Sequence, residues 1–500
     1  MSDRYVHPSH QFFLSSLWIV VVGVVGGVTL NNEQSLLAAD QAAKVFRAGA
    51  AAVDVTPVKL PVIINGNMLP VVTSDISDRL HARALVLHDG KNQVAIVIVD
   101  NCMMPRDLLD QAKTLASEAT GIPINHMLVA ATHSHSTPAV HGCLGVEVDI
   151  EYAKYLPGKI AEAITTAHKR LAPARIGFGV GRDEQNVGCR RWLMRPGTAP
   201  NNPFSGKQND LAQMHPGFNN PKALRPTGPT DPEVPVVAVQ TLDGKPLATL
   251  TNYSMHYVGA KPISADYFPV VCNKLEALLK ADKGYVGLHS NGTSGDQWLM
   301  DYTLPSRRMY TLDSVATDVA QAAFEAYQQI TFQDWAPLVM EEQLLEVGVR
   351  MPTADEVRAA RAIVDGFNLK QARTGDEIYA RETVLLSEMP PTRELKLQAL
   401  RIGELGITGI PNEVFAISGL TIKRRSPLKS TFTIELANGC EGYIPPLEQH
   451  ALGGYETWRA RTSCLEETAE IKIVSTVLDL LNAVAAARAD EQPVPSRKAE

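Results

Sequence analysis

Short apolar runs alternate along this chain with segments of helical periodicity. "RALVLHDG" and "NQVAIVIVD" are apolar runs separated by a turn at Asp89-Gly90, and this pattern predicts a buried β-hairpin. Residues 106–120 then have helical spacing that stops before Gly121. "HMLVAATHSHS" predicts a strand that runs into a loop, residues 151–171 a helix, and "ARIGFGV" another strand. This alternation predicts a mixed α/β fold with layered helices and sheets.

A long segment of different composition divides the chain. Residues 194–235 are rich in Pro, Gly and Asn, which predicts a segment without regular structure. A loop of this length inside a compact domain commonly covers a functional site, so we expect a lid, with an interdomain linker as the alternative. Strands resume at "VPVVAVQTL" and "PLATLTNYSMH". Helical spacing recurs in residues 269–281, 312–330, 354–367 and 462–487.

The N-terminus carries an uncharged apolar run, Phe12–Leu30, whose length fits a signal peptide or a short membrane anchor. A buried core helix is the alternative, but the run lies at the extreme terminus and a polar spacer follows it. We therefore expect residues 1–43 to be a leader plus spacer, 44–486 to be one domain, and 487–500 to be a disordered tail. The chain is expected to be exported, either periplasmic, secreted or associated with a membrane through this run.

Charge and cysteine content exclude two classes of protein. The net charge is −7 and the Lys and Arg residues form no basic block, which argues against a nucleic-acid partner. The six cysteines have no CxxC spacing, which excludes a cysteine-rich zinc ribbon. In an exported protein one or two cysteine pairs could be oxidised, and buried free thiols are the alternative.

The stretch "ATHSHSTPAVHG" concentrates histidines directly after an apolar run. In an extended segment residues two apart point to the same side, so His133 and His135 can face one ion or one substrate. Neutral imidazole is a good zinc ligand. Surface histidines are the alternative for such a pair, and His141, beyond Pro138, is expected to be a loop residue.

Two further candidates for metal ligands follow other apolar runs. His256 closes "LTNYSMH", and Asp266 follows soon enough to accept a hydrogen bond from a ligand histidine. A single core histidine is the alternative. Glu413 follows the buried strand predicted at residues 407–410 and lies where a helix begins, so a capping carboxylate is the competing role.

A glycine-rich loop and an arginine pair complete the candidates. Tyr443 and Tyr455 lie in "NGCEGYIPPLEQHALGGYETW", and composition alone would make them packing aromatics. Arg190 and Arg191 introduce the Pro-rich segment and could hold a carbonyl or oxyanion, surface arginines being the alternative.

Taken in order, these segments resemble the catalytic domain of the neutral/alkaline, non-lysosomal ceramidase family. "RAGAAAVDVTP" is similar to its opening strand, "AATHSHSTP" to its THTHSGP motif, "NYSMHYVG" to its second-histidine segment and "IPNEVF" to its PGE segment. The loop "NGCEGYIPPLEQHALGGYE" resembles its tyrosine-bearing stretch. The resemblance spans residues 47–481 and covers the catalytic domain only.

This resemblance implies a ceramidase-like zinc hydrolase catalytic domain over residues 44–486, with a set of roles carried over by position. The implied Zn²⁺ ligands are His133, His256, Glu413 and Tyr443. The residues implied to contact the reacting group are His135, Tyr455 and one of Arg190 and Arg191.

The sequence departs from the family pattern at two places. The family's GDVSPN hexapeptide falls within "SNGTSGDQWLMD", so Trp298 stands where the family has a serine that has been considered catalytic. An insertion, residues 352–393, is expected to reshape the rim of the pocket.

The expected function is therefore an exported zinc-dependent amidohydrolase that cleaves an N-acyl bond of a small molecule or lipid, as in sphingolipid metabolism. His135 would act as general acid/base, with Tyr455 and an arginine stabilising the oxyanion. This scheme needs no serine. The alternatives are a zinc-dependent esterase or N-acyl-sugar deacylase, and a non-catalytic exported binding protein that retains the fold.

Overall fold

The computed structural model describes residues 45–366 and 372–487. The expected leader and spacer, residues 1–43, and all but the first residue of the expected tail, 487–500, lie outside the described residues. Within the described ranges, no helix combines the length and apolar character needed to cross a membrane. The described cysteines are all free and buried. The alternative of buried free thiols is therefore the one that the structure has.

An eight-stranded sheet forms the centre of the fold, with the strand order β14-β13-β12-β7-β1-β4-β5-β6. The predicted hairpin is confirmed, because β4 and β5 pair antiparallel around the turn. Two neighbouring pairs, β5–β6 and β13–β14, are parallel. The strands are β1 Arg47–Asp54, β4 His81–His88, β5 Gln93–Val99, β6 Met127–Ala131, β7 Ala172–Arg182, β12 Glu233–Thr241, β13 Pro246–Tyr253 and β14 Val286–Asn291.

A four-stranded sheet, ordered β16-β17-β18-β20, packs against the large sheet. Side chains of both sheets share one apolar core. Leu85, Leu250 and Phe432 are examples, each at most 1% exposed. Burial of such side chains is the main favourable term in folding. The strands are β16 Leu338–Gly348, β17 Thr392–Ile402, β18 Leu405–Gly409 and β20 Ser430–Ile434.

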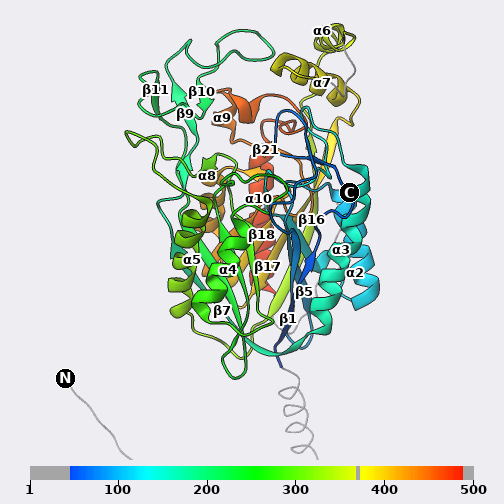
Figure 1. The fold of residues 1–500 in the computed structure, drawn as a ribbon, viewed down its shortest axis with the longest axis vertical. Coiled ribbons are helices and arrows are strands. Elements are labelled where there is room, and N and C mark those ends of the chain that lie inside the picture. Colours follow the sequence, from blue (N-terminus) through cyan, green and yellow to red (C-terminus); the bar gives the residue numbers. More distant parts are fainter. Residues whose placement is uncertain (1–44, 367–371, 488–500) are drawn as a thin grey trace, which may run out of the picture. The chain divides into compact units, whose positions relative to one another are not determined.

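Helices cover the outer faces of the sheets and complete the layered α/β architecture that the sequence predicts (Figure 1). α3 packs on β1 and β4 with α2 beside it, α5 packs on β7 and β12 with α4 beside it, and α10 packs on β16 and β17. The helices are α2 Arg106–Thr120, α3 Ile150–Lys169, α4 Phe268–Leu279, α5 Leu312–Gln328, α8 Ala416–Arg425 and α10 Ala469–Ala486.

Local sequence signals explain where several helices begin and end. α2 ends at Gly121, whose φ of 75° is the left-handed conformation that glycine adopts without strain. α5 begins with a capping box in which Thr311 and Ser314 bond each other's backbone. α10 begins at Ala469, later than the pattern over 462–487 indicates, because residues 462–468 form turns and bridges next to the glycine-rich loop.

The prediction that residues 194–235 lack regular structure is wrong for two short strands. β10 (Ala212–Met214) and β11 (Ala223–Pro226) pair with β9 (Arg191–Met194) from its two sides. Such edge strands need backbone pairing but no apolar periodicity, so composition gives no sign of them. The backbone amides of residues 211 and 212 bond the Leu452 carbonyl, which ties this segment to the glycine-rich loop.

The insertion at 352–393 forms a helix pair at the same end of the molecule as β9–β11 (Figure 1). α6 (Ala354–Val364) matches the predicted helix, and α7 (Gly375–Ser387) was not predicted. α7 buries two charged residues, Arg381 and Glu382, which a sequence pattern assigns to the surface. Its Tyr379 packs against Trp458.

Candidate metal centre

The predicted ligands come from segments far apart in sequence that the sheets bring together. His133 follows β6, His256 follows β13, and Glu413 lies in β19 (Glu413–Val414). β19 pairs in parallel with β21 (Tyr443–Ile444), and the register sets Glu413 opposite Tyr443. Backbone pairing of two very short strands therefore places the fourth predicted residue beside the third.

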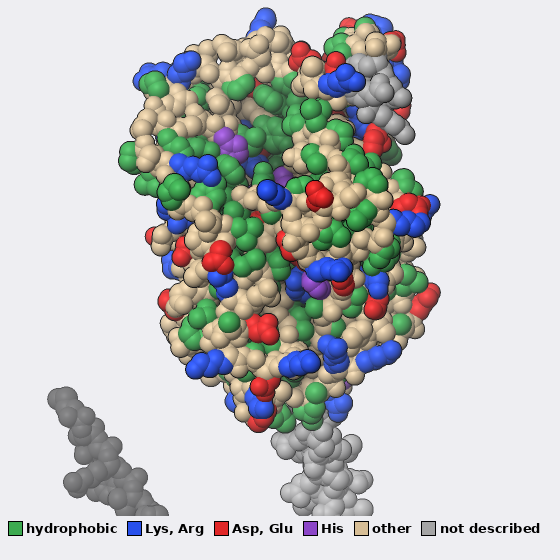
Figure 2. Space-filling view, in the orientation of Figure 1, with side chains coloured by type: hydrophobic (Ala, Val, Ile, Leu, Met, Phe, Trp, Pro, Cys, Tyr) green, Lys and Arg blue, Asp and Glu red, His purple; other side chains and the backbone are tan. Residues whose placement is uncertain are grey.

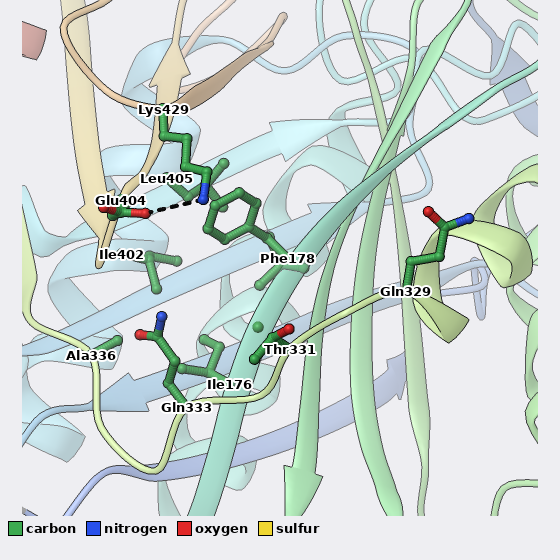
Figure 3. A pocket seen from close by; sticks show the side chains of 12 residues that line it. Ile176, Phe178, Gln329, Thr331, Gln333, Ala336, Ile402, Glu404, Leu405 and Lys429 are labelled. Atoms are coloured by element: carbon green, nitrogen blue, oxygen red, sulfur yellow. Dashed lines mark ion pairs between the residues drawn. The ribbon is translucent and has the colours of Figure 1, made fainter.

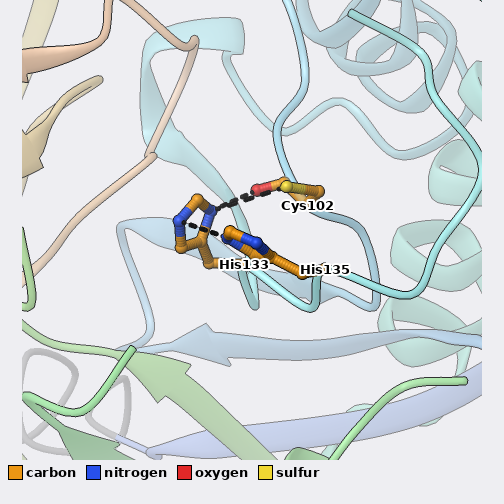
Figure 4. A group of neighbouring side chains, drawn as sticks. All are labelled: Cys102, His133 and His135. Atoms are coloured by element: carbon orange, nitrogen blue, oxygen red, sulfur yellow. Dashed lines mark hydrogen bonds between the residues drawn. The ribbon is translucent and has the colours of Figure 1, made fainter. Parts of the chain in front are cut away.

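His133 is oriented by its backbone and by a hydrogen bond. Its φ of 71° is left-handed, so His133 and His135 are not presented by an extended strand as the sequence pattern suggested. The Nδ1–H of His133 donates to the Cys102 carbonyl at 2.8 Å, as Figure 4 shows. A carbonyl can only accept, so this bond fixes the tautomer and leaves the Nε2 lone pair free.

His256 is held in the same way by a different partner. Its Nδ1 lies 3.2 Å from the Ser294 carbonyl and 3.2 Å from the Ser294 hydroxyl. The expected partner, Asp266, instead accepts backbone N–H bonds from residues 258, 259 and 267. Burial, followed by the nearby Arg190 guanidinium, lowers the pKa of His256 well below its usual value. The ring is therefore neutral, as a metal ligand requires.

Three lone-pair atoms converge at the centre. His133 Nε2 lies 3.0 Å from His256 Nε2 and 3.3 Å from Glu413 Oε2, and His256 Nε2 lies 3.8 Å from the same oxygen. All three side chains are buried, and Oε2 has no hydrogen-bond partner among the described residues. Tetrahedral zinc with bonds of about 2.0–2.1 Å spaces its ligand atoms about 3.3 Å apart. The residues therefore fit a zinc ion.

The capping role considered for Glu413 belongs to another residue. α8 begins at Ala416, and the Ala416 N–H donates to Asp296 Oδ1 at 2.9 Å. Glu413 lies outside the first turn of that helix, so its carboxylate is available to the centre.

The structure separates the two candidate arginines. Arg190 Nη2 donates to the Tyr443 hydroxyl at 3.0 Å and to the Gly295 carbonyl at 2.8 Å, while its Nε donates to Glu456 at 3.2 Å. Arg190 thus lies at the centre and holds Tyr443.

Arg191 is fully buried and faces away from the centre. Its guanidinium donates to Glu456 Oε2 and Gln449 Oε1, each at 3.0 Å, and to the Gly453 carbonyl. Its partners belong to the glycine-rich loop, so Arg191 holds the fold of that loop.

One side of the centre is open to solvent. His135 is partly exposed, its Nε2 lies 3.2 Å from His133 Nε2, and its ring stacks on Tyr257 with centroids 4.0 Å apart. Tyr455 is also partly exposed, with its ring centroid 5.9 Å from that of Tyr443. In Figure 2 the upper part of the molecule is hollowed, with histidine side chains (purple) at the edge of the hollow.

Sequence reasoning missed two buried groups behind the centre. Glu435, directly after β20, accepts from the Ser294 hydroxyl at 2.5 Å and from the Val414 amide at 2.9 Å. Burial raises the pKa of Glu435 to about 8. A carboxylate that follows an apolar strand is the signal that could have identified it. Cys102, the carbonyl partner of His133, carries no such signal.

Two other pockets share no residue with the centre. His141 lines a separate pocket of about 390 Å³ with Pro105 and Glu441, and so lies outside the centre. A pocket of about 260 Å³ beside β7 and β18 has a Glu404–Lys429 ion pair of 3.5 Å at its rim (Figure 3). Its lining contains no histidine or cysteine.

Comparison with known proteins identifies the fold. No family model and no curated protein matches the chain. Among solved structures, neutral ceramidase from Pseudomonas aeruginosa aligns with a TM-score of 0.66 at 17% identity, covering 91% of this chain and 76% of that chain. A ceramidase complexed with C2 aligns with a TM-score of 0.64 at 16% identity, covering 91% and 77% respectively. The chain therefore has the fold of these ceramidases.

Proposed function

We propose that this protein is a zinc-dependent hydrolase that cleaves the amide bond of an N-acyl substrate. The observation that carries the proposal is the convergence of three buried lone-pair atoms, from His133, His256 and Glu413, at 3.0–3.8 Å. Two imidazole Nε2 atoms 3.0 Å apart with a buried carboxylate oxygen beside them need a cation or a proton among them, because unpaired buried polar atoms are costly.

The ligands in this proposal are His133 Nε2, His256 Nε2, Glu413 Oε2 and the Tyr443 hydroxyl. Bound zinc lowers the pKa of a coordinated water and polarises a carbonyl. The Cys102 carbonyl keeps the His133 imidazole, and the Ser294 carbonyl the His256 imidazole, in the tautomer that leaves Nε2 free for the metal.

The remaining residues act on the substrate. Arg190, buried at the centre with its Nη2 on Tyr443, donates toward the carbonyl oxygen as negative charge develops there. His135 Nε2, on the open side, takes a proton from the attacking water and delivers it to the leaving nitrogen. Tyr455 flanks the same side. The water oxygen ends on the carbonyl carbon, the C–N bond breaks, and a carboxylic acid and an amine are released.

Trp298 is compatible with this scheme. The serine of the related motif is replaced, and the indole N–H instead donates to the Tyr257 carbonyl at 2.8 Å. The described site residues supply proton transfer and oxyanion contacts, and water is the nucleophile, so no serine is required.

Metal analysis tests the proposal directly. Purified protein is expected to contain about one zinc per chain by mass spectrometry. His133→Ala should lose both the zinc and the hydrolysis of N-acyl amides. His141→Ala is the matched control, because it removes a histidine of the same stretch from outside the centre. Full activity in metal-free protein would overturn the mechanism.

We also propose that the protein is exported through the apolar run Phe12–Leu30. Fractionation of cells that express the full chain tests this, with a chain starting at residue 44 as the control. Recovery of the full chain in the cytoplasm alone would contradict it.

A further inference from the structure

A buried carboxylate, Glu435, lies behind the metal centre and bonds two of the segments that carry the proposed ligands. Its Oε2 accepts from the Val414 amide at 2.9 Å and from the Ser294 amide at 3.1 Å. Its Oε1 accepts from the Ser294 hydroxyl at 2.5 Å. Val414 follows Glu413 in β19, and Ser294 lies beside His256. Glu435 and Ser294 are both fully buried, so bulk solvent does not compete for these bonds.

The groups around Glu435 fix the direction of each bond that the carboxylate makes. A backbone amide can only donate, so the two amides at Oε2 make this oxygen an acceptor. The 2.5 Å between Oε1 and the Ser294 hydroxyl oxygen is in the range of a hydroxyl that donates to a carboxylate. The hydrogen of the Ser294 hydroxyl therefore points to Glu435.

The lone pairs of the Ser294 hydroxyl oxygen then face two donors. Asn291 Nδ2, an amide nitrogen, lies 3.1 Å from this oxygen, and His256 Nδ1 lies 3.2 Å from it. A hydroxyl has one hydrogen and two acceptor sites, and these three partners use all of them. His256 must therefore carry its proton on Nδ1. The Ser294 carbonyl, 3.2 Å from the same nitrogen, makes the same demand.

We propose that Glu435 is a positioning residue that sets the tautomer of His256 through the Ser294 hydroxyl. With this tautomer, His256 Nε2 keeps its lone pair and faces His133 and Glu413, where zinc is proposed to bind. Tighter metal binding, the consequence of this tautomer, rests on the proposed function. The tautomer itself is a property of the metal-free chain. Glu435 is none of the four proposed ligands and acts only through Ser294.

Glu435→Gln keeps the size of the side chain and reverses one of its bonds. The glutamine oxygen takes the place of Oε2, where two backbone amides require an acceptor, so its NH2 group faces the Ser294 hydroxyl oxygen. The hydroxyl hydrogen then turns away from position 435 and toward His256 Nδ1, which accepts it only in the other tautomer. That tautomer carries its proton on Nε2 and has no lone pair there for a metal.

The tautomer is read in the metal-free full chain by nitrogen NMR of isotope-labelled histidine, with the His256 signal identified by its loss in His256→Gln. Spectra are recorded at about pH 9, where the Glu435 carboxyl is ionised, because burial raises its pKa to about 8. Wild type should carry the proton on Nδ1, and Glu435→Gln should shift it toward Nε2. Asp266→Asn is the matched control and should keep the wild-type tautomer, because this buried carboxylate accepts backbone amides without bonding His256.

Zinc affinity, measured by competition with a chelator, gives a second reading. Glu435→Gln should weaken zinc binding about 10–100-fold, the usual cost of losing a group that orients a ligand. In a Ser294→Ala background the same substitution should cost at least about fivefold less, because the hydroxyl that carries its effect is gone. A smaller difference between the two backgrounds would mean that Glu435 acts by its charge alone, which overturns the proposal.

The outcomes keep this proposal separate from the proposed function. If wild type binds no zinc, the proposed function fails, and the tautomer of the metal-free chain still decides the inference. If wild type carries the His256 proton on Nε2, or if Glu435→Gln leaves it on Nδ1, the proposal is wrong. If Glu435→Gln does not fold, Glu435→Asp replaces it, because the shorter carboxylate withdraws from the Ser294 hydroxyl. An unchanged tautomer and an unchanged zinc affinity in that variant would refute the role of Glu435.

Discussion

Glu456 bonds both Arg190, at the centre, and Arg191, which holds the glycine-rich loop, so its replacement by glutamine perturbs both. The residue is fully buried. Its Oε1 accepts from Arg190 Nε at 3.2 Å and its Oε2 from Arg191 Nη1 at 3.0 Å. Although burial raises the pKa of a carboxyl, Arg190 and Arg191 here hold the pKa of Glu456 below its usual value. Glu456→Gln keeps the shape and removes the charge.

The expected loss of stability follows from what the two guanidinium groups retain. Removing one partner of a buried ion pair costs about 3–5 kcal/mol. Arg191 keeps Gln449 and a carbonyl, and Arg190 keeps the Tyr443 hydroxyl and the Gly295 carbonyl. Glutamine also preserves one acceptor oxygen. We therefore expect a loss near the low end of this range, so that the free energy of unfolding falls by about 3 kcal/mol.

Urea denaturation of the zinc-loaded protein measures this loss, and kcat and zinc content are recorded on the same preparations. Zinc content should hold, because Glu456 contacts none of His133, His256 and Glu413, and Arg190 keeps its bond to the Tyr443 hydroxyl. The kcat should fall, because Arg190 loses one of its anchors. Asp334→Asn, which removes one partner of an exposed pair with Arg175, is the control and should match wild type. A change in Glu456→Gln smaller than about 0.5 kcal/mol would refute the reasoning.

Three further perturbations are expected to give these results. Chelation should lower the melting temperature of wild type but not of His133→Ala, as differential scanning fluorimetry can show, because metal binding contributes to folding free energy. Asp296→Ala should lower the free energy of unfolding in urea by about 1 kcal/mol, because it removes the side-chain acceptor of the Ala416 amide at the start of α8. No change would mean that another group accepts from the Ala416 amide. Burial, then the charge of neighbouring Lys396, lowers the pKa of Lys113 from 10.5 to about 7. Between these values the unfolded chain binds more protons, so wild-type stability should rise with pH relative to Lys113→Met, by about 1.4 kcal/mol per unit, and a pH-independent difference would contradict this.

The sequence predicts the large elements because apolar periodicity reports burial directly. The hairpin of β4 and β5 and the helix that ends at Gly121 are confirmed. β10 and β11 were not predicted, because pairing at a sheet edge requires no periodic pattern of apolar residues. α7 was not predicted, because it buries Arg381 and Glu382, whose bonding partners lie in distant parts of the sequence.

The candidate site could be assembled from sequence only through the order of its motifs. Periodicity places His133 and His256 at strand ends, but it does not say which strand ends meet. The carbonyl of Cys102 and the hydroxyl of Ser294 act through tertiary contacts that have no local signature. The choice between Arg190 and Arg191 likewise needs the side-chain directions, which differ for adjacent residues of a strand-like segment.

The pairing of the two-residue strands β19 and β21 means that the proposed metal site can form only late in synthesis. Tyr443 reaches the centre only when its strand has paired with Glu413, after most of the chain has been made. His133 and His256 are already 123 residues apart, so closing the site joins very long loops. A nascent or truncated chain that stops before Tyr443 lacks one of the four proposed ligands. Tight metal retention would then distinguish finished molecules from fragments, before any substrate is added.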